Sequence, residues 1–126
     1  MSRANRSAES RQAPRLRLPA MYTLVRVRRR GDERYSWSGY IYDISNSGMR
    51  FELDSPLEPG TQIEVKAMLP GSPHTTFAAS GHVVRRHDDS EDLGPTRMGM
   101  TFDSFAGRTD RRRLEDYISQ SGLKAA

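Results

Sequence analysis

Two arginines near the N-terminus have the chemistry to bind an anionic ligand. Arg11 and Arg15 are separated by Gln12-Ala13-Pro14, and because Pro14 disfavours helical backbone before it, the pair does not form one face of a helix. Each guanidinium is a planar fork of N–H donors that matches phosphate oxygens or the O6/N7 edge of guanine, and it can also stack on a purine ring. A guanine nucleotide would use all of these contacts.

A second candidate group lies in the segment Asp43-Ile44-Ser45-Asn46-Ser47-Gly48. Asp43 and Ser45 occupy alternate positions of a predicted strand, so we expect their side chains on one face. A carboxylate can accept hydrogen bonds from N1–H and the exocyclic amine of guanine, and a hydroxyl can contact base or phosphate. Gly48 permits a close approach or a positive φ. The segment predicts a guanine site, with a simple turn in which Asp43 and Ser45 bond the local backbone as the alternative.

Taken together and in order, these residues resemble the paired pattern of the PilZ domain family, Arg-x-x-x-Arg followed by Asp/Asn-x-Ser-x-x-Gly. The segment Gly99-Met100-Thr101-Phe102 is similar to the glycine-x-x-phenylalanine strand near the end of that family's domain. The matching positions are Arg11 and Arg15 in the first half, and Asp43, Ser45 and Gly48 in the second.

The resemblance implies a fold and a function. PilZ domains are six-stranded barrels that bind cyclic di-GMP on the outside, with the arginine segment folding over the ligand as a latch. On this resemblance we expect a bacterial, cytoplasmic cyclic di-GMP receptor or adaptor, with cyclic di-GMP as its ligand and no cofactor. Ligand binding would change the conformation of the N-terminal segment and signal to an unidentified downstream protein.

Composition and charge narrow the classes of function. A chain of 126 residues is the size of one domain. Ten arginines lie within residues 1–34 and the chain has only two lysines, so an anionic partner is expected near the N-terminus. The absence of cysteine excludes disulfides, thiolate zinc sites and cysteine nucleophiles. No motif of a serine nucleophile, a phosphate loop or a dinucleotide turn is present, and the histidines lack metal-site spacing, so we expect neither an enzyme nor a metal protein.

Hydrophobic periodicity predicts a mainly β fold. Alternation and turn residues favour about six short strands, namely 22–29, 35–44, 49–53, 63–69, 97–102, and a weaker candidate at 77–86 that is broken by Gly81. After Gly107 the period changes to that of a helix, with Thr109 as the capping candidate and Gly122 at the end. We therefore expect a six-stranded antiparallel β-barrel with a C-terminal α-helix over residues 15–122, a flexible basic tail over 1–14, and a short tail over 123–126.

Two other functions use the same residues. A small barrel with a basic N-terminal half could bind nucleic acid, which is less favoured here because the paired pattern points to a guanine ligand. A PilZ-like adaptor could bind a protein partner without any nucleotide. Trp37 and Tyr40 are expected to pack in the core, with stacking on a ligand base as the alternative, and the arginines of 26–34 are expected to face water. No segment reaches the roughly 18 apolar residues of a membrane helix, so no membrane span is expected.

Overall fold

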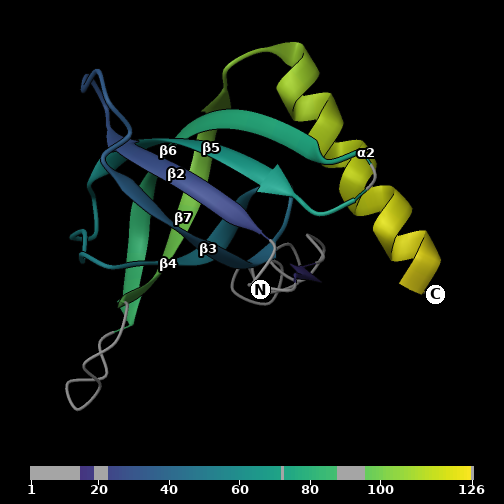
Figure 1. The fold of residues 1–126 in the computed structure, drawn as a ribbon, viewed down its shortest axis with the longest axis horizontal. Helices are drawn as coiled ribbons and strands as arrows, with labels where there is room; N and C mark the ends of the chain where they lie inside the picture. The colour runs from purple at the N-terminus through teal and green to yellow at the C-terminus, as the bar shows by residue number, and fades with distance from the viewer. Residues whose placement is uncertain (1–14, 19–22, 72, 88–95, 126) are drawn as a thin grey trace, which may run out of the picture.

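The computed structural model describes residues 15–18, 23–71, 73–87 and 96–125. Within these residues the chain forms one antiparallel sheet in the order β1-β3-β2-β5-β6-β7-β4, and an additional β3–β4 pairing joins its ends. Strands β2 to β7 therefore make a closed barrel of six strands, which confirms the predicted fold class (Figure 1). The elements are β1 (Leu16–Arg17), β2 (Leu24–Arg29), β3 (Trp37–Ile44), β4 (Gly48–Leu53), β5 (Gln62–Leu69), β6 (Thr75–His87), β7 (Thr96–Phe105) and the helix α2 (Arg108–Ala125).

The core fills the inside of the barrel and follows from strand alternation. In β5, every second residue from Ile63 to Leu69 is buried, while the residues between them are exposed or half-buried. The same period turns Val25 and Val27 of β2 inward and the neighbouring arginines outward. Since side chains of a strand alternate between its two faces, this pattern fixes which side chains face the outside of the barrel.

Strand β6 differs from its sequence prediction. We expected a weak strand broken at Gly81, but β6 continues through this residue as one strand of 13 residues. A Cβ at Gly81 would clash with the carbonyl oxygen of Thr101 on β7, and the β6–β7 register shifts between Ser80 and Gly81. Glycine therefore allows two backbones to approach at a bulge, which is a common reason for glycine inside a strand.

The helix α2 packs beside the barrel through two buried side chains, Leu114 and Ile118 (Figure 1). Asp110 in its first turn accepts a hydrogen bond from the backbone N–H of Ala78 at 2.8 Å. The predicted boundaries were inexact, because the helix begins at Arg108, before Thr109, and continues past Gly122 to Ala125. Among the described residues, no helix combines the length and the apolar character that crossing a membrane requires.

Candidate ligand-binding site

Arg15 reaches the outer face of the barrel because the short strand β1 precedes β2 along the same edge of β3. Leu16 pairs with Ile44, and Arg17 pairs with Asp43. Leu16 and Leu18 pack against the core, so the alternating arginines turn to the outside. We did not predict this strand, although the alternation of leucine and arginine over residues 15–18 was a visible signal for it.

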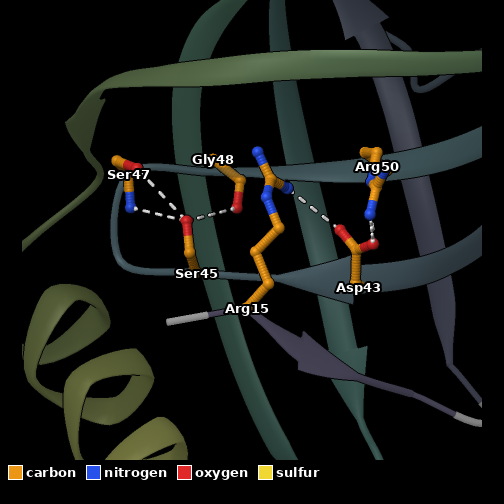
Figure 2. Close-up of polar contacts among 6 residues, drawn as sticks. All are labelled: Arg15, Asp43, Ser45, Ser47, Gly48 and Arg50. Atoms are coloured by element: carbon orange, nitrogen blue, oxygen red, sulfur yellow. Dashed lines mark hydrogen bonds and ion pairs between the residues drawn. The ribbon is translucent and has the colours of Figure 1, made fainter. Parts of the chain in front are cut away.

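The carboxylate of Asp43 joins two arginines that are distant in sequence. Its Oδ1 accepts a hydrogen bond from Nη1 of Arg15 at 3.0 Å, and its Oδ2 accepts one from Nε of Arg50 at 2.7 Å (Figure 2). The Asp43 side chain is 6% exposed, whereas both arginine side chains are 51% exposed. The hydrogen bond to Asp43 raises the pKa of Arg50 above its usual value, so this guanidinium is held firmly in its charged form. The result is a buried anion covered by two half-exposed cations.

Arg50 was absent from the predicted site. It is the cross-strand partner of Asp43 in the β3–β4 hairpin. The sequence did place Arg50 on the polar parity of the strand 49–53, but its distance from Asp43 depends on the hairpin register. That register shifts between Ile41 and Asp43, which the sequence pattern does not reveal.

Ser45 organises the turn between β3 and β4. Its side chain is buried, its Oγ lies 3.1 Å from Oγ of Ser47, and it accepts the backbone N–H of Ser47 at 3.3 Å (Figure 2). It also donates to the carbonyl oxygen of Gly48 at 3.3 Å. These contacts belong to the alternative that we kept for this residue, a hydroxyl that bonds the local backbone.

Replacing Ser45 by alanine should therefore destabilise the turn. The expected loss in free energy of unfolding is about 0.5–1.5 kcal/mol, because the buried Ser45 hydroxyl no longer bonds the exposed Ser47 and the Gly48 carbonyl oxygen. Urea unfolding followed by circular dichroism measures it. The matched control is Ser38→Ala on the exposed face of β3, which should change stability by less than about 0.5 kcal/mol. Equal stability of the two variants would contradict the structural role of the Ser45 hydroxyl.

Gly48 is required by a close approach and not by its φ angle. A Cβ at this position would clash with the carbonyl oxygen of Met100, because Gly48 lies beside β7 and pairs with Thr101. Among the described residues, positive φ is confined to Gly31, Gly60 and Gly71. Of the two reasons that we gave for glycine here, close backbone approach is therefore the one that applies.

An open hollow of about 370 Å³ lies beside these groups on the outside of the barrel. Three of its lining residues are arginines, and none is acidic. Arg85, Val84 and Gly99 come from β6 and β7, which lie far from Arg15 in sequence, so the sequence pattern could not place them next to Arg15. The lining consists of Arg15, Ser47, Gly48, Met49, Arg50, Val84, Arg85, Gly99, Met100 and Thr101.

The remaining predictions for this region have mixed outcomes. Arg11 lies outside the described residues. Trp37 packs partly against the core, with the Arg29 guanidinium 5.2 Å from its ring centroid. The prediction that Tyr40 packs in the core was wrong, because β3 alternates and its ring faces outward. No group of three or more metal-ligating side chains occurs among the described residues.

The model of the PilZ domain matches residues 9–120. The chain belongs to the PilZ domain family. This match includes both halves of the paired pattern, including Arg11, and extends through most of α2. No curated protein matches this PilZ domain in a sequence search.

Solved structures share its fold. They include the Bacillus subtilis inhibitor of motility MotI/DgrA, with a TM-score of 0.69 and 19% identity over 91% of this chain and 52% of that one. The PilZ domain of Escherichia coli YcgR with c-di-GMP has a TM-score of 0.64 and 18% identity over 90% of this chain and 92% of that one. The Klebsiella MrkH–c-di-GMP complex has a TM-score of 0.67 and 24% identity over 90% and 52%. This PilZ domain thus spans about half the length of MotI and MrkH.

Proposed function

We propose that this PilZ domain is a receptor for cyclic di-GMP. The observation that carries the proposal is the contact of Arg15 with Asp43, which joins the two halves of the motif at the edge of an arginine-lined hollow. Two structurally similar proteins, YcgR and MrkH, have c-di-GMP in their structures. The residues proposed to bind the ligand are Arg11, Arg15, Asp43, Ser45 and Gly48.

The charge of the hollow suits a cyclic dinucleotide. Cyclic di-GMP carries two phosphates and two guanines, and the lining offers Arg15, Arg50 and Arg85 with no carboxylate among them. Half of the Arg15 side chain is exposed while its guanidinium is already oriented by Asp43. An oriented guanidinium loses less conformational entropy when it binds a ligand, so a larger part of the contact energy contributes to the binding free energy. A volume of about 370 Å³ lies at the lower end of the range for ligand pockets.

Asp43 is proposed to bind the arginines and the ligand at once. Its Oδ1 accepts one N–H, from Arg15, and keeps a further acceptor position, whereas Oδ2 faces both Nε and Nη2 of Arg50. N1–H or the exocyclic amine of a guanine can use the position on Oδ1, and a contact with N1–H selects guanine over adenine, whose N1 carries no hydrogen. Arg15 and Arg50 are then free to direct their remaining donors to phosphate or to the O6/N7 edge.

The N-terminal segment is proposed to close over the ligand. Strand β1 has two residues and is attached to β3 through two paired positions and the Leu18 N–H bond to the Tyr42 carbonyl. Four residues span at most about 14 Å, so Arg11 is within reach of any ligand that Arg15 contacts. Fixing the backbone of residues 11–14 costs about 1–2 kcal/mol each, and two arginine contacts together with stacking on each base, roughly 1–3 kcal/mol apiece, offset this cost with a small surplus, which suits reversible binding. The repositioned segment is the proposed signal to a downstream protein.

Isothermal titration calorimetry with cyclic di-GMP tests the proposal. We expect saturable binding with a Kd of about 10 nM to 10 μM, and weak or no binding of GTP and cyclic di-AMP. Arg11→Ala/Arg15→Ala should abolish it, while Arg112→Ala, an exposed arginine on α2, should bind as the unmodified protein does. Absence of heat at high ligand concentration would overturn the receptor proposal. Tight binding of an oligonucleotide with steep salt dependence would favour nucleic acid instead.

A further inference from the structure

An apolar row crosses three neighbouring strands on the outside of the barrel. Leu24 of β2 pairs with Tyr40 of β3 on one side and with Met68 of β5 on the other. Their exposed fractions are 46%, 42% and 39%, and all three are large hydrophobic side chains. Strands β3, β2 and β5 lie side by side in Figure 1, so the three residues form one line across the strands. Exposed apolar side chains that adjoin one another, unlike scattered ones, make this row a candidate interaction site.

A row of cations runs alongside these residues. Arg26 lies two residues after Leu24 on β2 and pairs directly with Lys66 of β5. Both side chains are exposed. Like charges placed directly opposite each other destabilise a sheet. The nearby Glu64 does not relieve this, because it accepts a hydrogen bond from Arg28 at 2.8 Å. Within the described residues neither Arg26 nor Lys66 forms an ion pair with a carboxylate, and the Lys66 ammonium lies 4.9 Å from the ring centroid of Tyr35. A ring contact does not neutralise a charge, so both cations can still pair with an anion.

The two ends of the apolar row differ in charge. Beyond Met68, which pairs with Thr76 of β6, Arg113 of α2 donates to the Thr76 carbonyl oxygen at 3.4 Å. At the other end Tyr40 pairs with Glu52 of β4, whose carboxylate accepts a hydrogen bond from the Tyr42 hydroxyl. None of the residues in the apolar row or the cation row lines the arginine-rich hollow. This surface is therefore separate from the site proposed to bind the nucleotide, and an inference about it does not depend on that proposal.

We propose that this apolar and basic face, formed by Tyr40, Leu24, Met68, Arg26 and Lys66, docks an acidic amphipathic helix of a partner protein. Side chains on neighbouring strands repeat at about 4.8 Å across the sheet, and successive turns of a helix rise about 5.4 Å. Apolar residues at i, i+4 and i+7 of a helix can thus contact Tyr40, Leu24 and Met68 one after another. Acidic residues beside them on the helix face Arg26 and Lys66.

The charge of this face favours an acidic partner helix over a helix from a second copy of the chain. The described helix that could dock in trans is α2, whose residues 108–116 carry Arg108, Arg111, Arg112 and Arg113 against Asp110, Glu115 and Asp116, a net charge of +4 − 3 = +1. A segment without net negative charge does not complement the cations Arg26 and Lys66. An anionic partner helix has the complementary charge.

The probe for this proposal is a synthetic helical peptide with leucines at i, i+4 and i+7 and glutamates beside them. Binding is measured by fluorescence anisotropy and located by NMR chemical-shift changes. We expect the changes to cluster on β2, β3 and β5, and Leu24→Glu or Met68→Glu to weaken binding at least about tenfold. Arg26→Glu/Lys66→Glu should weaken it similarly and improve binding of the same peptide with lysines in place of glutamates. The matched controls on α2, Ser119→Glu and Arg112→Glu, should change affinity by less than about twofold.

Several results would overturn the proposal. They are no binding, shift changes outside the three strands, or equal binding of the glutamate and lysine peptides. If the peptide does not bind and anionic lipid vesicles bind through this face, the face is a membrane-binding surface. Self-association in sedimentation velocity that disappears in Leu24→Glu would assign it to a second copy. Should Leu24→Glu fail to fold, Leu24→Thr keeps strand propensity, removes most of the apolar contact and provides the same test.

Discussion

Asp43→Ala is expected to lower the affinity for cyclic di-GMP at least about thirtyfold. The substitution removes the acceptor proposed for guanine and also leaves the guanidinium groups of Arg15 and Arg50 without the carboxylate that orients them. Truncating one partner of a buried, hydrogen-bonded charge pair costs about 2–5 kcal/mol in binding, which corresponds to a factor of about 30 to several thousand. Calorimetric titration measures the loss.

The comparison variant for Asp43→Ala is Asp54→Ala, which removes an exposed carboxylate just after β4 and should bind normally. Circular dichroism establishes that both variants are folded. Retained affinity in Asp43→Ala would contradict the assignment of this carboxylate to the site. Equal losses in both variants would indicate a general electrostatic effect instead.

A ligand analogue separates the two roles of Asp43. Cyclic di-IMP lacks the exocyclic amine of guanine, so the unmodified protein should bind it about tenfold or more weakly than cyclic di-GMP if Asp43 accepts from that amine. In Asp43→Ala the two ligands should then bind alike. If the variant still distinguishes them as strongly as the unmodified protein does, Asp43 acts by positioning Arg15 and Arg50 and not by contacting the base.

Gly48→Val is expected to have the largest effect on stability. A side chain at Gly48 meets the backbone carbonyl of Met100, and a backbone atom in a closed barrel cannot move aside as a flexible side chain can. To make room, β4 must shift away from β7, which strains the paired positions Gly48–Thr101 and Met49–Met100. We expect a loss of roughly 3 kcal/mol or more in the free energy of unfolding, a large part of a typical 5–15 kcal/mol.

Urea unfolding measures this loss, and Gly99→Ala on β7 is the matched control for stability. A Cβ at Gly99 meets its nearest atoms, all of them side-chain carbons, at 3.9 Å, which is ordinary van der Waals contact. Gly99→Ala should therefore change stability by less than about 1 kcal/mol. Similar stability of Gly48→Val and Gly99→Ala would show that β4 and β7 are not in tight contact at Gly48.

Much of this barrel could be predicted because its local signals agree. The alternation in residues 63–69 identifies β5 and its buried face, and the turn residues Pro59-Gly60 and Pro70-Gly71 bound it. Side-chain period and turn chemistry depend on a few neighbouring residues, so a linear sequence carries them in full. The same holds for the candidate segments at Arg15 and at Asp43, whose residue types already indicated an anion and a guanine as ligand.

Local sequence patterns thus predicted a six-stranded barrel with a helix and the two motif halves of the proposed site. The folded arrangement adds that Asp43 is shared between Arg15 and Arg50, and that Arg85 lines the same hollow. It also decided that Gly81 lies at a bulge inside β6 and that Tyr40 faces solvent beside Leu24. Arg15 and Arg85 reach the hollow from strands that are far apart in sequence, and the positions of Arg50 and Gly81 follow register shifts inside the β3–β4 and β6–β7 pairings. Closure of the barrel brings these strands together, and residue types along the chain do not reveal where a register shift falls.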